Sequence, residues 1–198
     1  MGPLSQPLRQ RKQIRLRGYD YDQPGAYFLT ICTQNRECLF GDVANGMMQL
    51  NDTGLMVQET WRQLPSHYPH IVLDEFIVMP NHLHGILVIT APPPNVGAVH
   101  EPSPSDDTDT DIGAIRESPL QRRAILPKAV GRFKMVTAKQ INQYRQTPGW
   151  PVWQRNYYEH IVRTENDLNP IRNYIISNPA QWAQDTENPH YHPTPSQT

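Results

Sequence analysis

Two histidines separated by one residue carry the strongest chemical signal in the sequence. His82 and His84 lie in the run Met-Pro-Asn-His-Leu-His at 79–84, which leads directly into an apolar, β-branched stretch. Because side chains alternate along a strand, both imidazoles are expected on one face, with Cα atoms about 6.6 Å apart at about 3.3 Å per residue. Two neutral imidazoles at that spacing can bind one divalent ion and leave positions open for a phosphate oxygen. The alternative is a pair of amphipathic side chains at a strand edge.

The remaining histidine pair and the cysteines give weaker signals. His190 and His192 repeat the spacing inside a proline-rich tail, where we interpret them as solvated. Cys32 and Cys38 lack Cys-x-x-Cys spacing, so we interpret them as reduced, structural thiols rather than as a disulfide or a zinc site.

Length and composition indicate one domain with polar extensions. The 198 residues include 20 prolines, which cluster near both ends and in the middle. We expect a basic N-terminal arm at 1–25, a folded domain at 26–182 and a C-terminal tail at 183–198. Within the domain, residues 91–115 are rich in Pro, Ser, Asp and Thr and predict a disordered acidic insert.

The charges are segregated along the chain. The net charge is −1, but removing the five acids of the 91–115 insert leaves +4. Basic residues gather at 9–17 and at 116–145, a distribution typical of proteins that bind a phosphate backbone. The sequence has no apolar run of membrane-spanning length and no signal-peptide core, so we expect a cytoplasmic, nucleoid-associated protein without a membrane partner.

The strands that would position the histidines can be read from apolar patterning. Strands are expected at 26–33, 71–79 and 82–89, the last two forming a hairpin through Pro80-Asn81, and a looser alternation predicts another at 152–162. A small ribbon at 38–41 and 47–50, closed by Asn45-Gly46, is expected outside the main sheet.

Three helices are expected around these strands. The first begins at Asn51 or Asp52, has Leu55, Met56, Trp61 and Leu64 on its buried face, and ends at Pro65; the second covers 126–145. The last opens at Thr164 and stops at Asn178-Pro179. The order β, α, β, β, α, β with a final helix predicts an α+β, ferredoxin-like (RRM-like) antiparallel sheet of about four to five strands with helices packed on it.

Three motifs in this order resemble a known family. Met-Pro-Asn-His-Leu-His at 79–84 is followed by Pro-Val-Trp-Gln-Arg-Asn-Tyr-Tyr-Glu-His-Ile-Val-Arg at 151–163 and Ile-Arg-Asn-Tyr-Ile-Ile-Ser-Asn-Pro at 171–179. Together they are similar to the HUH single-tyrosine transposases, and within them to the branch of REP-associated tyrosine transposase-like proteins. The resemblance covers nearly the whole chain except the acidic insert and the extreme termini.

The resemblance implies a metal site and a nucleophile. His82 and His84 would bind Mg²⁺ or Mn²⁺, which grips the scissile phosphate, and Tyr174 would form a 5′-phosphotyrosine link to DNA. Asn178, one helical turn beyond Tyr174, would be the polar third ligand, a position that the family commonly fills with Gln. His160 is the alternative third ligand, and Tyr157 and Tyr158 are the alternative nucleophiles.

The resemblance also implies single-stranded DNA hairpins as partners, from repeated extragenic palindromes or element ends. Phosphate and base contacts are expected from basic and aromatic side chains, namely Arg9, Arg11, Lys12, Arg15, Arg17, Arg132, Lys134, Arg155, Tyr157 and Tyr158. Whether the protein acts as a monomer or as a homodimer is left open. So are two other functions: a non-cleaving nucleic-acid-binding module on the same sheet, and a zinc hydrolase, which lacks a clear third ligand.

Overall fold

The computed structural model describes residues 24–90 and 125–191. The expected basic arm up to residue 23, the acidic insert at 91–115 and the last residues of the tail lie outside these ranges. The five expected DNA contacts of the arm therefore lie outside the described residues, namely Arg9, Arg11, Lys12, Arg15 and Arg17.

A four-stranded antiparallel sheet forms the centre of the described structure. It consists of β1 (Gly25–Cys32), β4 (Ile71–Met79), β5 (His82–Ile89) and β6 (Tyr158–Val162), in the order β4-β5-β1-β6. The two central strands are thus the first and third of the sheet along the chain, as in a ferredoxin-like βαββαβ unit. The predicted fold class is confirmed.

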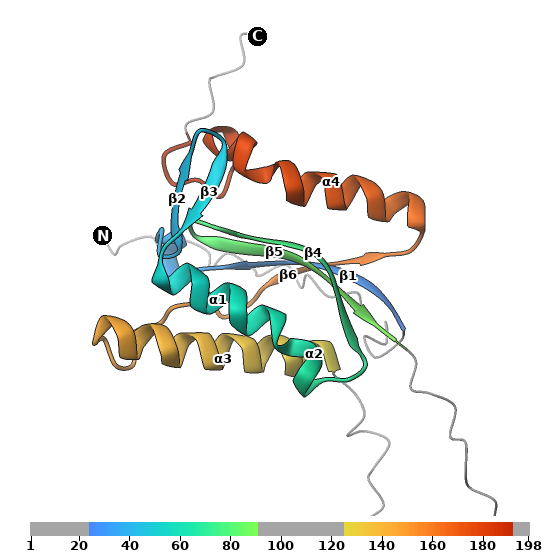
Figure 1. The fold of residues 1–198 in the computed structure, drawn as a ribbon, viewed down its shortest axis with the longest axis horizontal. Helices are drawn as coiled ribbons and strands as arrows, with labels where there is room; N and C mark the ends of the chain where they lie inside the picture. Colours follow the sequence, from blue (N-terminus) through green and yellow to red (C-terminus); the bar gives the residue numbers. More distant parts are fainter. Residues whose placement is uncertain (1–23, 91–124, 192–198) are drawn as a thin grey trace, which may run out of the picture.

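Helices cover both faces of this sheet. Figure 1 shows α1 (Asp52–Arg62) and α3 (Ile125–Arg145) on one face and α4 (Glu165–Gln181) on the other. Alternation along β1 sends Tyr27, Leu29 and Ile31 into the larger core beneath α1 and α3, whereas Phe28 faces α4. The face of the sheet under α4 is therefore the face on which even-numbered residues of β1 and β5 lie.

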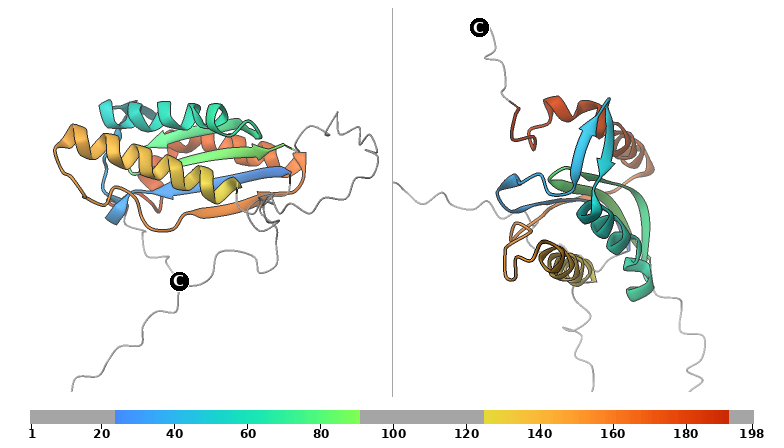
Figure 2. Two further views of the ribbon diagram at one scale, coloured as in Figure 1. Left: turned by 90° about the horizontal axis from the view of Figure 1, so that it is seen from below. Right: turned by 60° about the vertical axis from the view of Figure 1, so that its left-hand side comes forward.

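The larger core supports β5 from behind. Trp61 of α1 is fully buried against Gly85, where an added Cβ would approach the indole Cζ2 to 2.6 Å. Only glycine lets the ring lie on the strand backbone here, directly opposite the face that carries His84. Figure 2 shows the same layering from two further directions.

The ribbon β2 (Gly41–Ala44) and β3 (Met47–Leu50) is a separate two-stranded sheet, as expected. Its turn places Asn45 and Gly46 at φ 53° and 71°, the left-handed conformations that an Asn-Gly hairpin turn requires. Within the described part of the chain, no helix has both the length and the apolar character needed to cross a membrane.

The buried face of the first helix was predicted partly wrongly. Asn51 does cap α1, because its side chain accepts from the Gly54 amide at 3.0 Å. Leu55, however, is exposed, and Val57 lies in the core instead. Pro65 lies in the first turn of the four-residue α2 (Leu64–His67) rather than ending α1, and a proline is tolerated there because the amides of a first helical turn have no partner within the helix.

Two expected boundaries near the C-terminus also differ. β6 begins only at Tyr158, because Trp153 turns into the core and donates from Nε1 to Thr137 Oγ1 at 2.9 Å. The last helix continues through Pro179 to Gln181, and both Asn178 and Pro179 are buried, so packing outweighs the local preference to end before a proline.

Candidate active site

The two histidines at the start of β5 lie side by side under α4. The Pro80-Asn81 turn ends at His82, and alternation puts His82 and His84 on the same face with Leu83 in the opposite core. Both are buried, with 0% and 3% of their surfaces exposed, and their Nε2 atoms are 3.0 Å apart. The expected convergence of the two rings is present.

Hydrogen bonds to the outer ring nitrogens fix how the imidazoles point. His82 Nδ1 lies 2.8 Å from Asn81 Oδ1, while the Asn81 amide nitrogen donates to the carbonyls of Arg36 and Glu187 at 3.0 and 2.7 Å. The Asn81 oxygen can therefore only accept, so Nδ1 of His82 carries the proton. His84 Nδ1 lies 2.8 Å from the Thr30 hydroxyl, which can accept in the same way.

His82 Nε2 therefore carries a lone pair, which faces His84 Nε2 across 3.0 Å. When the Thr30 hydroxyl donates, Nε2 of His84 carries a proton and donates to that lone pair; when the hydroxyl accepts, the lone pairs of both Nε2 atoms face one point and can bind a cation together. Burial lowers the pKa of His82 to about 3 and that of His84 well below its usual value, with Arg36 and His82 respectively adding repulsion. Both rings are consequently neutral at pH 7, the form that binds a metal.

Asp185 completes a group of metal-binding side chains. It follows the short 3-10 helix Trp182–Gln184, and one carboxylate oxygen lies within 4.8 Å of the ligand atoms of His82 and His84. The sequence analysis predicts this residue in the C-terminal tail at 183–198 and names no carboxylate among the metal ligands. No spacing rule identifies it, because only the return of the chain after α4 brings it to β5.

A salt bridge holds the segment that carries Asp185. Arg36 binds Glu187 through Nε at 3.0 Å and Nη2 at 3.2 Å, and donates from Nη1 to the Thr186 carbonyl at 2.9 Å. Arg36 and its neighbour Asn35 both have φ near 57°, a left-handed pair that turns the guanidinium toward this segment. The position of Asp185 therefore depends on a loop more than 140 residues earlier in the chain.

The Cys32 thiol also contacts this segment. It donates to Glu187 Oε2 at 3.4 Å, and burial together with Glu187 raises its pKa to about 12. Cys32 and Cys38 are both free, as the sequence predicts.

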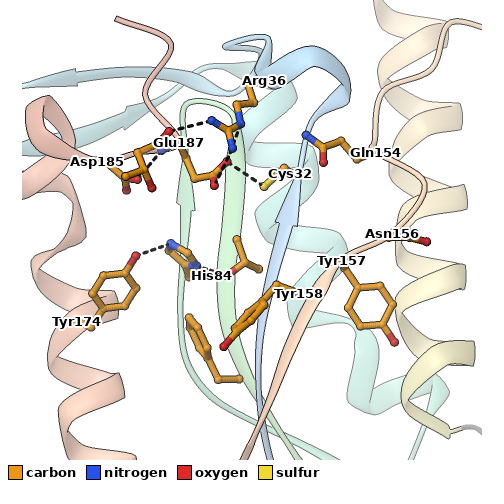
Figure 3. A pocket seen from close by; sticks show the side chains of 13 residues that line it. Cys32, Arg36, His84, Gln154, Asn156, Tyr157, Tyr158, Tyr174, Asp185 and Glu187 are labelled. Atoms are coloured by element: carbon orange, nitrogen blue, oxygen red, sulfur yellow. Dashed lines mark hydrogen bonds and ion pairs between the residues drawn. The ribbon is translucent and has the colours of Figure 1, made fainter. Parts of the chain in front are cut away.

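Tyr174 projects from α4 onto the histidine pair. Its hydroxyl lies 3.2 Å from His84 Nε2 (Figure 3). Its ring stands edge-on to Phe28, with the ring centroids 6.2 Å apart. Burial and, after it, Asp185 raise the pKa of Tyr174, whereas a hydrogen bond with Asn178 opposes the rise. The phenol is consequently protonated at neutral pH in the absence of a nearby cation.

Asn178 contributes a buried oxygen beside this tyrosine. Only 1% of the residue is exposed, and its Oδ1 has no hydrogen-bond partner among the described residues. It lines a hollow of about 260 Å³ together with Tyr174 and Asp185. Two imidazole nitrogens and a carboxylate, with an orphaned amide oxygen on the neighbouring helix, are donors that fit a divalent cation.

The other expected site residues divide into two groups. Tyr157 and Tyr158 line a second hollow beside Tyr174, and Tyr158 alone of the two belongs to β6. His160 lies on β6 opposite Phe28 and is not part of the group around His82.

The expected basic contacts lie farther from the histidines. Arg155 is exposed and does not line the second hollow, and Arg132 contacts His67 at 3.2 Å on the α3 face of the sheet. Lys134 donates to the carbonyls of Gln154 and Arg155, so its ammonium group supports the segment before β6. Its partial burial lowers its pKa.

Comparison with known proteins places the chain among relatives of transposases. No family model matches. An uncharacterized protein of Haemophilus influenzae is 39% identical over 185 residues, which are 90% of this chain and 93% of the relative. A second protein of the same organism, provisionally named a REP-associated tyrosine transposase, is 26% identical over 82% of this chain and 74% of its own length.

Among solved structures, a REP-associated tyrosine transposase bound to a REP hairpin aligns with a TM-score of 0.47 at 18% identity, over 84% of this chain and 73% of that one. A likeness at this level adds nothing to the argument on function, which therefore depends on the sequence relatives and on the site. By sequence, the chain belongs to one family with the uncharacterized Haemophilus protein, and it is more distantly similar to the protein provisionally named a REP-associated tyrosine transposase.

Proposed function

We propose that this protein is a metal-dependent single-stranded DNA transposase and endonuclease that cleaves and rejoins DNA at hairpin sites through a 5′-phosphotyrosine on Tyr174. One observation carries the proposal: the Tyr174 hydroxyl lies 3.2 Å from Nε2 of a buried histidine whose ring is already oriented for metal binding. A nucleophile, a cation site and an open hollow meet at this point.

The proposed reaction exchanges one phosphoester for another. Tyr174 Oη attacks the scissile phosphorus, the bond to the 3′ oxygen breaks, and that oxygen leaves with a proton as a free 3′-hydroxyl. The tyrosine proton passes to solvent. Because the phosphotyrosine bond retains the phosphodiester energy, attack by a 3′-hydroxyl reverses the step, and strands are rejoined without nucleotide hydrolysis.

Four side chains would hold Mg²⁺ or Mn²⁺ in this site: His82, His84, Asp185 and Asn178. When bound, the ion supplies positive charge that offsets the developing charge on the phosphate and favours the phenolate. The chain itself orients the imidazoles through Asn81 and Thr30, and holds the tyrosine against Phe28.

The name of the more distant relative motivates a hairpin of a repeated extragenic palindrome as substrate. The basic arm at 9–17 is proposed to contact the DNA backbone, together with Arg155, whereas Arg132 and Lys134 are weaker candidates because both are engaged on the α3 side. A non-cleaving binding module is not favoured, since simple binding would not require two inward-facing histidines beside a tyrosine.

The test is formation of a covalent adduct. Purified protein is incubated with labelled single-stranded hairpins from the palindromic repeats that flank its gene, with Mn²⁺, Mg²⁺ or EDTA, and run on a denaturing protein gel. We expect a metal-dependent adduct that is absent from Tyr174→Phe and reduced at least a hundredfold in His84→Ala. Tyr144→Phe, an exposed tyrosine on α3, is the matched control and should retain the adduct.

Two results would contradict the proposal. An adduct that persists in Tyr174→Phe would move the nucleophile to Tyr157 or Tyr158. Hairpin binding without an adduct under any metal would replace cleavage with simple binding.

A further inference from the structure

A groove runs between α1 and α3, on the face of the sheet opposite to α4. Its volume is about 420 Å³, and α1 provides most of its lining, with Gln140 and Tyr144 of α3 on the other side. Figure 2 shows the two helices side by side on this face. The groove therefore lies away from the candidate active site, and the proposed reaction makes no use of it.

Apolar side chains line the groove although they are open to solvent. Leu55 and Tyr144 are 51% and 54% exposed, and the partly buried Met56 lies beside them. Leu55 belongs to the apolar pattern that predicts the buried face of the first helix, yet no element among the described residues covers it. Exposed apolar side chains that gather in one groove are typical of a surface that binds another segment of chain.

The groove is also acidic. Asp52 accepts a hydrogen bond from the Tyr144 hydroxyl at 2.6 Å, and Glu59 accepts one from the Gln63 amide at 2.9 Å. Both donors are neutral, and within residues 24–90 and 125–191 neither carboxylate forms a salt bridge and no lysine or arginine lines the groove. Two carboxylates without a cationic partner make the groove complementary to a basic segment.

The basic arm has the composition that this groove complements. Residues 9–17 carry five basic side chains and no acid, together with the apolar Ile14 and Leu16. Arginine and lysine side chains suit the two carboxylates, and the isoleucine and leucine suit the exposed apolar side chains between them.

The arm also joins the domain near the groove. β1 begins at Gly25, which pairs with Ile89, and Ile89 pairs with Ile71, the residue at which the chain enters β4 after α1 and α2. Neighbouring strands lie about 4.8 Å apart, so the arm joins the sheet about 10 Å from Ile71. The seven residues from Arg17 to Pro24 span at most about 25 Å, and the 11 residues of α1 about 16 Å, which brings the arm within reach of the groove.

We propose that the groove between α1 and α3 binds the basic arm at 9–17 of the same chain when no DNA is present. The basic side chains of the arm contact Asp52 and Glu59, and its apolar side chains cover Leu55. Because the groove and α4 lie on opposite faces of the sheet, an arm bound there is withheld from DNA at Tyr174. Binding of the arm does not depend on the proposed function; only its competition with DNA rests on that function.

Tryptic cleavage measures whether the arm is bound, because trypsin cuts after lysine and arginine and acts on a segment while it is released. The full chain without DNA is digested briefly at low salt, and products cut within residues 9–17 are quantified by mass spectrometry. Leu55→Ser combined with Glu59→Gln should raise the initial cleavage rate about tenfold, since that rate follows the released fraction of the arm. Both residues are exposed, so the fold does not depend on them.

A matched control makes the same kinds of change elsewhere. Met135 is 63% exposed and does not line the groove, and Glu75 is an exposed acid of β4. Met135→Ser combined with Glu75→Gln should leave the cleavage rate unchanged. Equal rates in the wild type and the groove variant, or an equal increase in the control, would overturn the proposal.

Cross-linking identifies which copy of the chain supplies the arm. Lys12 is the only lysine within residues 1–23, and a carbodiimide joins an ammonium group directly to a carboxylate that it contacts. We expect a link from Lys12 to Asp52 or Glu59 in the monomer band of a denaturing gel. The same link in a dimer band would assign the arm to a second copy, and links only to other carboxylates would place it elsewhere; either result would overturn the proposal.

Hairpin binding tests the competition with DNA. Fluorescence anisotropy in EDTA measures the affinity for the same hairpin oligonucleotides, and the groove variant should bind them several-fold more tightly than the wild type because its arm is released. Equal affinities would overturn the competition. If neither protein binds a hairpin or forms an adduct while the wild-type arm stays protected from trypsin, the proposed function is wrong and binding of the arm in the groove stands.

Discussion

The candidate metal site depends on side chains that would not contact the cation. Asn81 and Thr30 hold the two Nδ1 atoms, so the Nε2 atoms converge without freedom to rotate. Asp185 differs from the two histidines because it lies in an irregular segment. Arg36 holds this segment by binding the next two residues, Thr186 and Glu187. Its contribution to metal affinity can therefore be removed without disturbing the sheet.

Asp185→Asn should weaken Mn²⁺ binding about 10- to 100-fold, because a neutral amide replaces the only carboxylate of the group. Isothermal titration of the DNA-free protein with Mn²⁺ measures the change. Asp42→Asn, an exposed aspartate of β2, is the control and should bind as the wild type does. Unchanged affinity in Asp185→Asn would leave Asn178 as the third ligand.

Two sets of side-chain contacts stabilise the position of α4, the helix that carries Tyr174. At its start, Thr164 Oγ1 accepts from the Asp167 amide at 3.2 Å and donates to the Asp167 carboxylate at 2.8 Å, a departure from the usual capping box in which the acid reaches the backbone. Two residues before the tyrosine, Arg172 binds Asp74 in the bulge of β4 through Nε and Nη2 at 2.9 and 2.6 Å.

Thr164→Ala should lower the free energy of unfolding by about 1 kcal/mol, since the alanine leaves the Asp167 amide uncapped. Urea denaturation followed by circular dichroism measures the loss. Thr164→Ser retains the hydroxyl and should recover most of the stability. Equal losses in both variants would mean that the methyl group, rather than the cap, stabilises this end of α4.

The Asp74–Arg172 pair should make stability depend on pH. Hydrogen bonds from Arg172 hold the pKa of Asp74 below its usual value, and Glu165 and Asn169 share the same guanidinium. A carboxyl whose folded pKa is lowered stabilises the protein above its unfolded pKa of about 3.9, and this contribution is lost as pH falls through the folded pKa.

Asp74→Asn should therefore be less stable than the wild type near neutral pH, and the difference should shrink as the pH falls below about 4. Urea unfolding of both proteins across this range measures the difference. Glu75→Gln, the exposed neighbour, is the control and should show no such convergence. A difference that stays constant at low pH would assign the loss to packing instead of charge.

One copy of the chain contains every group that the proposed reaction needs. Tyr174 reaches His84 of its own sheet, and α4 packs on that sheet through Leu168 and Ile175. Such an arrangement favours action in cis over exchange of the last helix between the subunits of a homodimer.

Mixing Tyr174→Phe with His84→Ala should therefore restore no adduct. If two chains exchanged their tyrosine helices, a mixed dimer would combine the intact tyrosine of one chain with the intact histidines of the other. The denaturing gel described above measures the outcome, and each variant alone provides the baseline. Recovery of about a quarter or more of wild-type adduct would show that the tyrosine helix acts in trans.

Residue spacing in the sequence predicted those parts of the fold and of the site that depend on the regular geometry of one strand or one helix. Alternation along one strand was sufficient to place His82 and His84 together, and the four-residue spacing on a helix placed Tyr174 near Asn178. The order of elements predicted the sheet, because a hairpin and two crossovers leave few ways to pair four strands.

Tertiary packing decided the rest. Trp153 lies outside its expected strand because its indole packs in the core and donates to Thr137. Lys134, a predicted DNA contact, donates to two carbonyls, which no local pattern indicates. Asp185 could not be found at all, since its position follows from the contact between Arg36 and Glu187, two residues far apart in the sequence with no shared pattern.

β5 begins at His82, and the chain leaves the sheet at the opposite end of this strand. β5 ends at Ile89, roughly 23 Å from His82 at about 3.3 Å per residue. The next described element, α3, begins at Ile125. A fluorescent reporter inserted after Ile89 would therefore join the chain at the end of β5 that lies far from both histidines, and would make the protein visible in a cell.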